Sequence, residues 1–414
     1  MKKRLAHCFL AVIALALSTS TVVAQDYKAR VTRVLKATPL IDGHNDWPDN
    51  LREREGDGRW TADLRDLGNR PKPYDTDIVR LRQGMVGGQF WSVWVSSSLP
   101  SPEQVKQTLE QIALVHSMVE RFPETFALAR TGADVRRIHK SGRIASLIGV
   151  EGGGQIDSSL AVLRAYRDLG AGYLTLTHSK TIEWADSATD DPKHDGLTEF
   201  GETVVLELNR LGMLVDLSHV SEATMLDALR VTRAPVIFSH SSARALNDHP
   251  RNVSDAVLAK VASNRGVVMV TFPPSYLDDA FRRWSADRDA EKARLNSPPF
   301  GGLFIGQPDK AAAALAEWER THPKPTVPLA VVADHIEHIV KVAGIDHVGI
   351  GSDFDGMGAD YPLGLNDVSH YPDLLAELMR RGWSDADVAK LAGGNILRVM
   401  DEAEMVARKM NSRE

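Results

Sequence analysis

The chain has 414 residues, of which 43% are hydrophobic and 25% are charged, and this composition is typical of a globular protein with a large core. The formal net charge is −6 and the basic residues form no stripe, so nucleic acid is not an expected partner. Cys8 is the single cysteine, which excludes an intrachain disulfide and requires any metal site to use histidine, aspartate or glutamate.

Residues 1–24 have the pattern of a secretory signal peptide. A positively charged start at residues 2–4 precedes the apolar run Phe9–Leu17, which is too short to span a bilayer, and small residues offer a cleavage site after Ala24. We therefore expect a periplasmic or secreted protein whose mature part, residues 25–414, is a single domain. An uncleaved membrane anchor is the alternative, and no later run is long and apolar enough to span a membrane.

Eight short apolar segments have the length and composition of buried strands, and helical patterns stand between most of them. The strands are expected at residues 39–42, 89–95, 144–150, 173–177, 213–217, 235–239, 266–272 and 347–351. Helices are expected at residues 25–36, 77–83, 102–121, 158–169, 222–231, 328–342 and 386–392. Ser221 is placed to cap the helix that follows it, and the polar residues 49–75 indicate a long loop. The alternation predicts an α/β protein with a (β/α)8 TIM barrel.

The chain is longer than the ~250 residues typical of this barrel, so insertions are expected. The clearest candidate is residues 276–325, which follow the seventh strand. This segment contains the strongly charged helical stretch Asp278–Leu295 and a second helical stretch near Ala311–Thr321. Because loops after barrel strands lie on the face that carries active sites, we interpret the segment as a flap or as a surface for self-association.

Histidine or carboxylate side chains stand at the carboxyl ends of six of the predicted strands. They are His44, Asp46, Glu151, His178, His219, His240 and Asp353. Taken singly, each has an ordinary interpretation as a satisfied polar residue, a helix cap, a turn residue or an ion-pair partner. Together they would meet at one rim of the barrel, where they would repel and desolvate one another without a cation. The sequence therefore predicts a metal site.

Several long motifs, spread from about residue 34 to residue 405, resemble the zinc-dependent membrane (renal) dipeptidase family, peptidase family M19. The motifs are Ile41-Asp-Gly-His44-Asn-Asp46, Ile148-Gly-Val-Glu151-Gly-Gly, Tyr173-Leu-Thr-Leu-Thr-His178, Asp216–His219, Phe238-Ser-His240-Ser-Ser, His249-Pro-Arg251-Asn-Val and Gly351-Ser-Asp353-Phe-Asp-Gly. The fold of that family is a (β/α)8 barrel of the metal-dependent hydrolase type, in agreement with the strand pattern.

The resemblance implies two zinc ions. One would be held by His44 and Asp46, the other by His219 and His240, and Glu151 would bridge them. Imidazole and carboxylate ligands suit zinc, although manganese or cobalt could substitute. Water between two such cations loses a proton near neutral pH and becomes a nucleophile for a peptide carbonyl.

The resemblance also assigns residues to the substrate. His178 would bind the developing oxyanion, and Arg251 would hold the substrate carboxylate. Asp353 would take the proton from water and pass it to the leaving amine, with Asp355 as a rival whose alternative role is to close a loop. Three further histidines are interpreted as solvated helix or loop residues: His249, His335 and His338.

The predicted function is that of an exported dinuclear zinc dipeptidase. The resemblance implies dipeptide substrates with a free C-terminal carboxylate, tolerance of a D-residue at the C-terminal position, and a homodimer. One alternative is a barrel metal hydrolase that acts on a cyclic amide, lactam or lactone, for which Arg251 would not be needed. A second alternative is an exported binding protein without turnover, because a fold alone does not imply catalysis.

Overall fold

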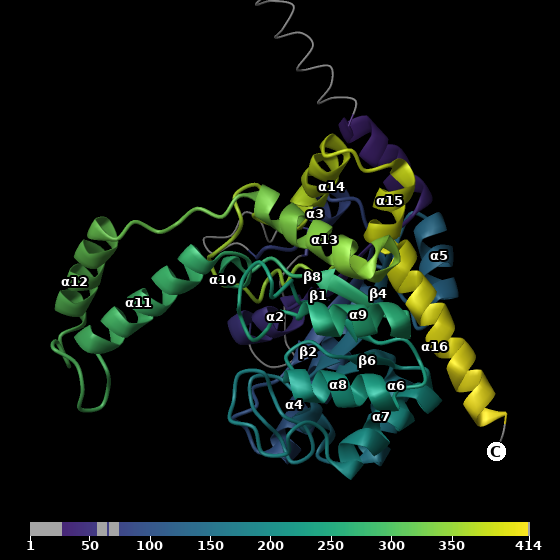
Figure 1. The fold of residues 1–414 in the computed structure, drawn as a ribbon, viewed down its shortest axis with the longest axis horizontal. Helices are drawn as coiled ribbons and strands as arrows, with labels where there is room; N and C mark the ends of the chain where they lie inside the picture. The colour runs from purple at the N-terminus through teal and green to yellow at the C-terminus, as the bar shows by residue number, and fades with distance from the viewer. Residues whose placement is uncertain (1–26, 56–63, 66–73, 413–414) are drawn as a thin grey trace, which may run out of the picture.

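The structure, a computed structural model, describes residues 27–55, 64–65 and 74–412. Its central sheet contains the eight predicted strands, here β1 (Leu40–Asn45), β2 (Val86–Trp94), β4 (Ile144–Glu151), β5 (Ala171–Thr175), β6 (Leu214–Asp216), β7 (Ile237–Phe238), β8 (Val267–Val270) and β9 (Val348–Ile350). They are parallel and follow the order β2-β1-β9-β8-β7-β6-β5-β4, and β2 also pairs with β4. This pairing closes the ring, so the predicted (β/α)8 barrel is confirmed (Figure 1).

The helices that surround the barrel include a helix at residues 27–37, which carries no label, and those labelled in Figure 1. The labelled helices are α2 (Trp47–Glu55), α3 (Ile78–Gln83), α4 (Ser101–Arg121), α5 (Gly132–Lys140), α6 (Leu160–Leu169), α7 (Glu199–Leu211), α8 (Glu222–Val231), α9 (Asp255–Asn264), α10 (Pro274–Leu277), α11 (Asp279–Leu295), α12 (Pro308–Thr321), α13 (Leu329–Ala343), α14 (Tyr371–Arg380), α15 (Asp385–Ala389) and α16 (Asn395–Asn411). None of the described helices is both long and apolar enough to cross a membrane.

The structure contains five helices that the sequence analysis did not predict: α5, α7, α9, α14 and α16. Two further departures concern α2 and a short strand. Residues 49–55 were predicted as loop but belong to α2, where Trp47 and Leu51 are the buried apolar residues. A helix with so few apolar residues facing the core gives a hydrophobic periodicity that is too weak to detect in the sequence. The short strand β3 (Phe126–Leu128) was also missed, and it pairs with the first residues of β4. Residues 56–63 and 66–73 of the predicted loop, and the predicted signal peptide, lie outside the described residues.

The barrel interior is a packed core rather than a pore. Phe90, Leu147, Tyr173 and Met269 are fully or almost fully buried within one apolar cluster. Strand β4 is buried at every position, as expected for a parallel sheet covered on both faces. The register of β2 against β4 ends with Trp94 opposite Glu151, so the carboxyl ends of these two strands lie level at one rim.

Helix α8 illustrates how the sequence fixes the start of an element beside the rim. The Ser221 side chain accepts a hydrogen bond from the Thr224 backbone N–H at 3.2 Å, which confirms the predicted N-cap. The chain between β6 and this cap is short and contains His219. The cap therefore limits how far the histidine can lie from the end of its strand.

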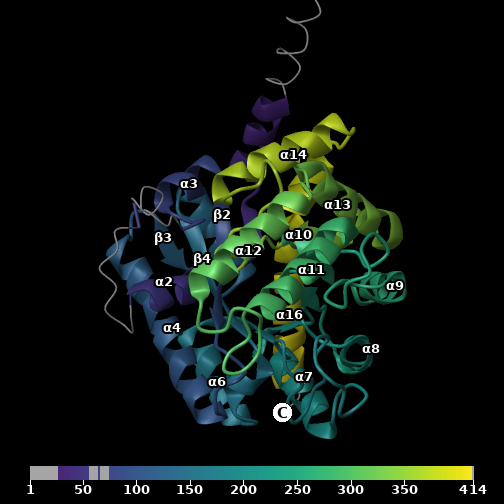
Figure 2. The same cartoon turned by 90° about the vertical axis from the view of Figure 1, so that its left-hand side faces the viewer.

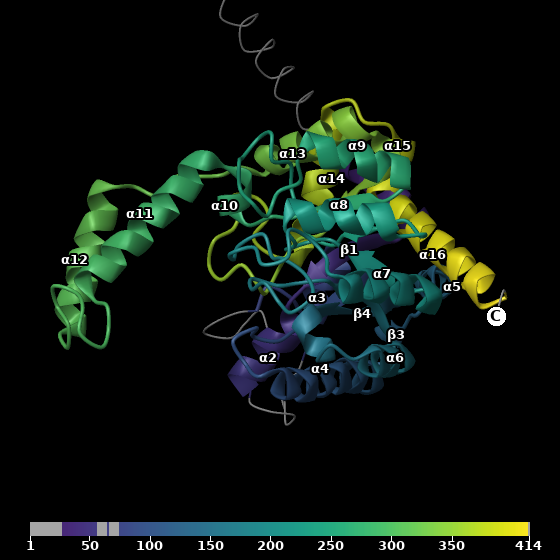
Figure 3. The same ribbon diagram turned by 60° about the horizontal axis from the view of Figure 1, so that its bottom comes forward.

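Helices α11 and α12 project from the barrel as a two-helix arm, defined here as residues 279–321 (Figures 1, 2 and 3). Within the arm helices, the buried residues are Phe281, Leu295 and Ala311. The arm starts from α10, which borders the carboxyl-end rim, and α16 lies on the far side of the barrel (Figure 3). Both helical stretches predicted for this insertion are thus present as helices.

Candidate metal centre and substrate pocket

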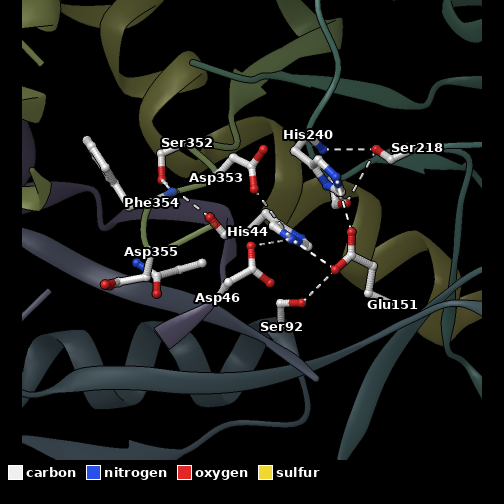
Figure 4. A network of polar contacts seen from close by, with 12 residues as sticks. His44, Asp46, Ser92, Glu151, Ser218, His240, Ser352, Asp353, Phe354 and Asp355 are labelled. Atoms are coloured by element: carbon white, nitrogen blue, oxygen red, sulfur yellow. Dashed lines mark hydrogen bonds and ion pairs between the residues drawn. The ribbon is translucent and has the colours of Figure 1, made fainter. Parts of the chain in front are cut away.

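The barrel brings the predicted ligands together at the carboxyl-end rim. His44 lies near the end of β1 and Glu151 is the last residue of β4, while His219 and His240 follow β6 and β7. Asp46 directly follows β1 and precedes α2. Figure 4 shows the side chains of His44, Asp46, Glu151 and His240 converging on one place. The rim thus collects residues that are far apart in the sequence.

The Glu151 carboxylate is the centre of this cluster. Its Oε1 lies 3.0 Å from His219 Nε2 and 3.4 Å from His240 Nε2, and its Oε2 lies 3.4 Å from His44 Nε2. The Asp46 carboxylate adds an oxygen 3.3 Å from the same His44 nitrogen. The other four side chains predicted to bind metal therefore lie around the Glu151 carboxylate, with imidazoles on both of its oxygens.

The two predicted catalytic residues border the same cluster. His178 Nε2 lies 3.8 Å from Glu151 Oε1, and Asp353 Oδ1 lies 4.0 Å from His44 Nε2. Donor atoms of Glu151, His178 and His219 can be chosen within 4.8 Å of one another, and the same holds for His44, Asp46 and Asp353. His178 and Asp353 therefore stand on opposite sides of Glu151.

A hydroxyl group orients the His44 ring. His44 Nδ1 lies 3.1 Å from the Tyr173 hydroxyl, and that hydroxyl donates to the Gly43 carbonyl at 3.4 Å. We infer that Nδ1 carries a proton and donates it to Tyr173, which leaves Nε2 facing the carboxylates of Asp46 and Glu151. Among the described residues this Nε2 has no hydrogen-bond partner. A Cβ at Gly149 would overlap the Tyr173 ring, so glycine is needed in β4 at this position.

The electrostatic field at His44 Nε2 favours a cation. Burial of the ring disfavours the charged form, but the charge of Glu151, with those of Tyr173 and Asp46, raises the pKa of His44 well above its ordinary value. A positive charge at Nε2 is therefore stabilised, whether a proton or a metal ion supplies it. The donor set of imidazoles and carboxylates fits a divalent metal ion such as zinc.

The other side of the cluster has its own orienting hydroxyl. Ser239 Oγ donates to Asp216 Oδ2 at 2.6 Å, so it accepts from His240 Nδ1 at 2.8 Å. This arrangement leaves His240 Nε2 unprotonated, with its lone pair available to a metal ion. The Nε2 atoms of His240 and His219 lie 2.9 Å apart. The Thr175 hydroxyl also donates to Asp216 Oδ2, at 2.6 Å, without touching His240. Asp216 thus supports a metal-facing imidazole through Ser239.

Glu151 and Asp353 have opposite pKa shifts. Burial acts to raise the pKa of Glu151, yet the charge of His44 and the contacts with the imidazoles of His219 and His240 hold it well below its usual range. Burial, followed by repulsion from Asp46, raises the pKa of Asp353 well above its usual range. Carboxylates with divergent pKa values in one site are suited to different roles. Glu151 stays ionised as an acceptor, whereas Asp353 readily takes up a proton.

Asp355 closes a loop rather than facing the metal cluster. Its Oδ1 accepts hydrogen bonds from Asn50 Nδ2 and from the Asp75 backbone N–H, each at 2.9 Å, and its own N–H donates to Asp75 Oδ2 at 2.7 Å. Burial and the charge of Asp75 raise the pKa of Asp355 to about 8. The loop-closing interpretation of Asp355 is therefore favoured over that of a rival to Asp353.

The loop after β9 holds strained backbone. Asp353 and Asp355 have φ values of 73° and 64°, and His219 at the opposite side of the rim has 68°. Non-glycine residues rarely adopt this left-handed region, and such strain concentrates at functional sites. A Cβ at Gly356 would collide with the carboxylates of Asp46 and Asp353, so a larger residue there would displace them.

Arg251 is a buried guanidinium without a carboxylate partner among the described residues, and its side chain is only 2% exposed. It donates to the His240 carbonyl at 3.2 Å and to Ser241 Oγ at 3.4 Å, and its Nε has no partner in the described part of the chain. Its guanidinium carbon lies 5.5 Å from the centre of the Tyr276 ring. A buried cation with free donors is suited to hold an anionic ligand group.

A pocket of about 680 Å³ opens above the cluster. Arg251, Tyr276 and His178 line one side of it, and residues of α2 and of the loop after β9 line the other. The second side is acidic. Its carboxylates are Asp49, Glu53, Asp75 and Asp355. Burial, with repulsion from Asp46 and Glu53, raises the pKa of Asp49 to about 7 despite its ion pair with Arg52.

Sequence reasoning missed the residues that support the ligands, chiefly Tyr173, Asp216 and Ser239. All three lie inside the quoted motifs, so the motifs were the available signal. The interpretation of His335 as solvated is wrong: its side chain is buried. His335 Nδ1 accepts from the Ala243 N–H at 3.1 Å and Nε2 contacts the Leu277 carbonyl at 3.0 Å. It ties α13 to the loop after β7 and to α10.

Comparisons with known proteins agree with this site. The family model described as membrane dipeptidase, peptidase family M19, matches residues 28–414. The dipeptidase aclJ of Aspergillus oryzae is 41% identical over 394 residues, which are 93% of this chain and 82% of that protein. The crystal structure of the probable dipeptidase PvdM from Pseudomonas aeruginosa has a TM-score of 0.74 at 28% identity and covers 92% of this chain and 100% of that one. The crystal structure of dipeptidase AC, a metallopeptidase of family M19, has a TM-score of 0.70 at 26% identity and covers 89% of this chain and 99% of that one.

The two hydroxyls on Asp216 provide a matched test of the His240 support. Ser239→Ala is expected to weaken zinc binding by about 10- to 100-fold, the usual cost of losing a group that orients a ligand. Thr175→Val removes an equally short bond to Asp216 but leaves His240 Nδ1 paired, so zinc binding should change little. Competition with a chromophoric chelator measures the affinity, and thermal melting controls for folding. Equal losses in both variants would contradict the role given to Ser239.

Proposed function

This chain belongs to peptidase family M19, the membrane dipeptidases, and we propose that it is an exported dinuclear zinc dipeptidase. The observation that carries the proposal is the cluster of five imidazole and carboxylate side chains centred on Glu151, beside the buried Arg251, which has no carboxylate partner among the described residues. The same pocket therefore offers a place for cations and a place for a substrate carboxylate. The proposed substrates are dipeptides with a free C-terminal carboxylate.

The metal ligands follow from the geometry of the cluster. His44 and Asp46 would hold one zinc ion, His219 and His240 would hold the other, and Glu151 would be shared, since its two oxygens face the two sets of imidazoles. Bound zinc would supply the positive charge that lowers the pKa of water and polarises a peptide carbonyl. The hydroxyls of Tyr173 and Ser239 keep the imidazoles turned toward these positions.

Arg251 orients the substrate. Its guanidinium lies on the His240 side of the cluster, because it donates to the His240 carbonyl. A dipeptide whose carboxylate pairs with this guanidinium has its peptide bond beside the metal ligands. Such pairing fixes one end of the substrate and holds the scissile carbonyl in one orientation, which is how binding contributes to rate.

His178 and Asp353 then act on the reacting atoms. His178 Nε2, on the His219 side, would donate to the oxygen that becomes negative when the carbonyl is attacked. Burial lowers the pKa of His178, so the ring is neutral and can serve as a hydrogen-bond donor through Nε2 while Nδ1 faces Ser179 Oγ at 3.2 Å. Asp353 would receive the proton from water and deliver it to the leaving amine, a transfer favoured by its raised pKa.

We also propose that the enzyme accepts a D-residue at the C-terminal position, as the resemblance to the family implies. The proposed contact of that residue is made by its carboxylate, and the partner for this carboxylate among the described residues is Arg251. The side chain of a C-terminal residue can therefore differ in configuration without losing the main contact.

Metal removal tests the central proposal. The purified protein should hydrolyse L-Ala-L-Ala and L-Ala-D-Ala, lose this activity after treatment with a chelator, and regain it with zinc. Metal analysis of the active protein should find two zinc ions per chain, because two sets of ligands flank Glu151. A protein that keeps its activity with no divalent ion bound would refute the proposal.

Substitution of Arg251 separates dipeptides from cyclic amides. Arg251→Ala should raise KM for L-Ala-L-Ala by roughly 10- to 100-fold, the range for losing a charge-assisted hydrogen bond to a carboxylate. The C-terminal amide L-Ala-L-Ala-NH2 lacks the carboxylate and serves as the control, and its weaker turnover should respond much less. Full dipeptidase activity in Arg251→Ala would instead favour a hydrolase for cyclic amides.

Export is proposed from the pattern of residues 1–24, with cleavage after Ala24. When the full chain is produced in a bacterium with two membranes, the protein should accumulate in the periplasm. N-terminal sequencing of that protein should begin at Gln25. A chain that retains Met1 in the cytoplasmic fraction would count against the signal peptide.

A further inference from the structure

One face of α2 forms a row of polar side chains that leads away from the metal ligands. The pocket is lined by Asp46, which precedes the helix, then by Asp49 and Asn50, and then by Glu53 and Arg54. Residues three, four and seven positions apart lie on the same side of a helix. The row therefore starts at the proposed metal ligand Asp46 and continues into the outer pocket. Each further turn of the helix adds one carboxylate, first Asp49 and then Glu53.

The loop after β9 and the segment before α3 add acidic groups beside this row. Asp355 is fixed to it by the hydrogen bond from Asn50, and Asp355 in turn binds the backbone of Asp75. We call Asp49, Glu53, Asp75 and Asp355 the acidic wall. Asp49 is 6% exposed and is held in place by hydrogen bonds from Gln111 at 3.1 Å and from Arg52 at 3.2 Å.

The pocket thus has a positively charged group, Arg251, at one end and the acidic wall at the other. Arg251 contacts the His240 side of the metal cluster, and α2 begins at Asp46 on the His44 side. A dipeptide that places its carboxylate on Arg251 and its peptide bond at the cluster must extend its N-terminal residue toward the acidic wall. The side chain of that residue, and not the C-terminal one, therefore faces the carboxylates.

A dipeptide can carry two cationic groups on its N-terminal residue, the α-ammonium and the side chain. The distance along α2 decides which of them can reach the acidic wall. A helix rises about 1.5 Å per residue, so Glu53 lies roughly 10 Å beyond Asp46 along the axis. The α-ammonium is only two bonds from the scissile carbonyl carbon, and it stays near Asp46 and Asp353. An extended lysine or arginine side chain is several bonds longer, and it can bring its charge to Asp49 and Glu53.

Two cations lie at the acidic wall among the described residues, and one of them, Arg52, pairs with Asp49 at 3.2 Å. Arg54 also lines the pocket, and its guanidinium carbon lies 4.3 Å from the centre of the Tyr74 ring, against which it stacks. With Asp49 paired to Arg52, the guanidinium of Arg54 does not balance Glu53 together with the adjacent pair Asp75 and Asp355, even when that pair carries a single charge. The outer pocket therefore keeps a negative potential that attracts a cationic side chain.

We propose that this enzyme is specific for dipeptides whose N-terminal residue has a basic side chain, lysine or arginine, which the acidic wall binds. The inference rests on the proposed function, because it takes the dipeptide orientation set by Arg251. It adds the substrate class and names Asp49 and Glu53 as the specificity-determining residues.

The test compares three dipeptides that differ in the N-terminal side chain: L-Lys-L-Ala, L-norleucyl-L-Ala and L-Glu-L-Ala. Norleucine matches the length of lysine without its charge. The zinc-loaded enzyme should show kcat/KM for the lysine dipeptide more than about fivefold above that for norleucine, with glutamate lowest, as several partly screened charges act together. The preference should shrink in 0.5 M salt, since exposed charges are screened.

A charge-removing variant assigns the preference to the wall. Glu53→Gln changes an exposed side chain, so the fold should be retained, and the lysine-to-norleucine ratio should fall by about two- to fivefold, as for the loss of one partly exposed ion pair. Glu120→Gln on the outer surface of α4 removes the same charge far from the pocket and is the matched control. In that variant the ratio should stay as in the unchanged enzyme.

The outcomes distinguish a failure of the proposed specificity from a failure of the proposed dipeptidase function. Equal kcat/KM for lysine and norleucine dipeptides, or a ratio that Glu53→Gln leaves unaltered, overturns the specificity inference while dipeptide hydrolysis itself stands. If the zinc-loaded enzyme hydrolyses none of the three dipeptides, the proposed function fails instead. A lysine preference that falls in Glu53→Gln and persists in Glu120→Gln supports the acidic wall as the specificity site.

Discussion

The contact of one buried carboxylate with three imidazoles is the constraint on which the site depends. Glu151 is 3% exposed, its Oε2 accepts from Ser92 Oγ at 3.0 Å, and both of its oxygens face histidines. Because unmatched charge in such a place costs several kcal/mol, the cluster is stable only when positive charge balances the carboxylates. The closed barrel meets this condition by ending its strands at one rim, within a few ångströms of one another.

Two buried aspartates beneath the rim give the ligands fixed orientations. Asp216 accepts hydrogen bonds from Thr175, Ser239 and the backbone N–H of Ser218, and so links β5, β6 and β7. Asp42 has the same role on the other side, where it accepts from Ser352 and Tyr371. Each aspartate lies shortly before a predicted metal ligand in the chain, so the strand ends and the ligands are held by the same bonds.

The arm changes the surroundings of the site but not its chemistry. It begins next to Tyr276 of α10, which lines the pocket, and just beyond it Lys324 forms an ion pair with Asp360 in the loop after β9. Tyr276 also contacts Arg251. The insertion therefore borders the substrate pocket where it starts and contacts the loop after β9 where it ends, while the metal ligands all come from the barrel strands and the loops that directly follow them. A barrel of this kind can acquire such loops because its core does not involve them.

The sequence by itself determined the order of the eight strands, the capped helix after Ser221 and the residues at the strand ends, because these follow from local apolar patterns and from short motifs. It could not reveal α2, where Trp47 and Leu51 alone mark the core face, and so the acidic row from Asp49 to Glu53 was hidden in a predicted loop. Only the tertiary structure decided which hydroxyl orients which histidine. Tyr173 reaches His44 from another strand, and hydrogen bonds between strands depend on barrel closure, which no local pattern encodes.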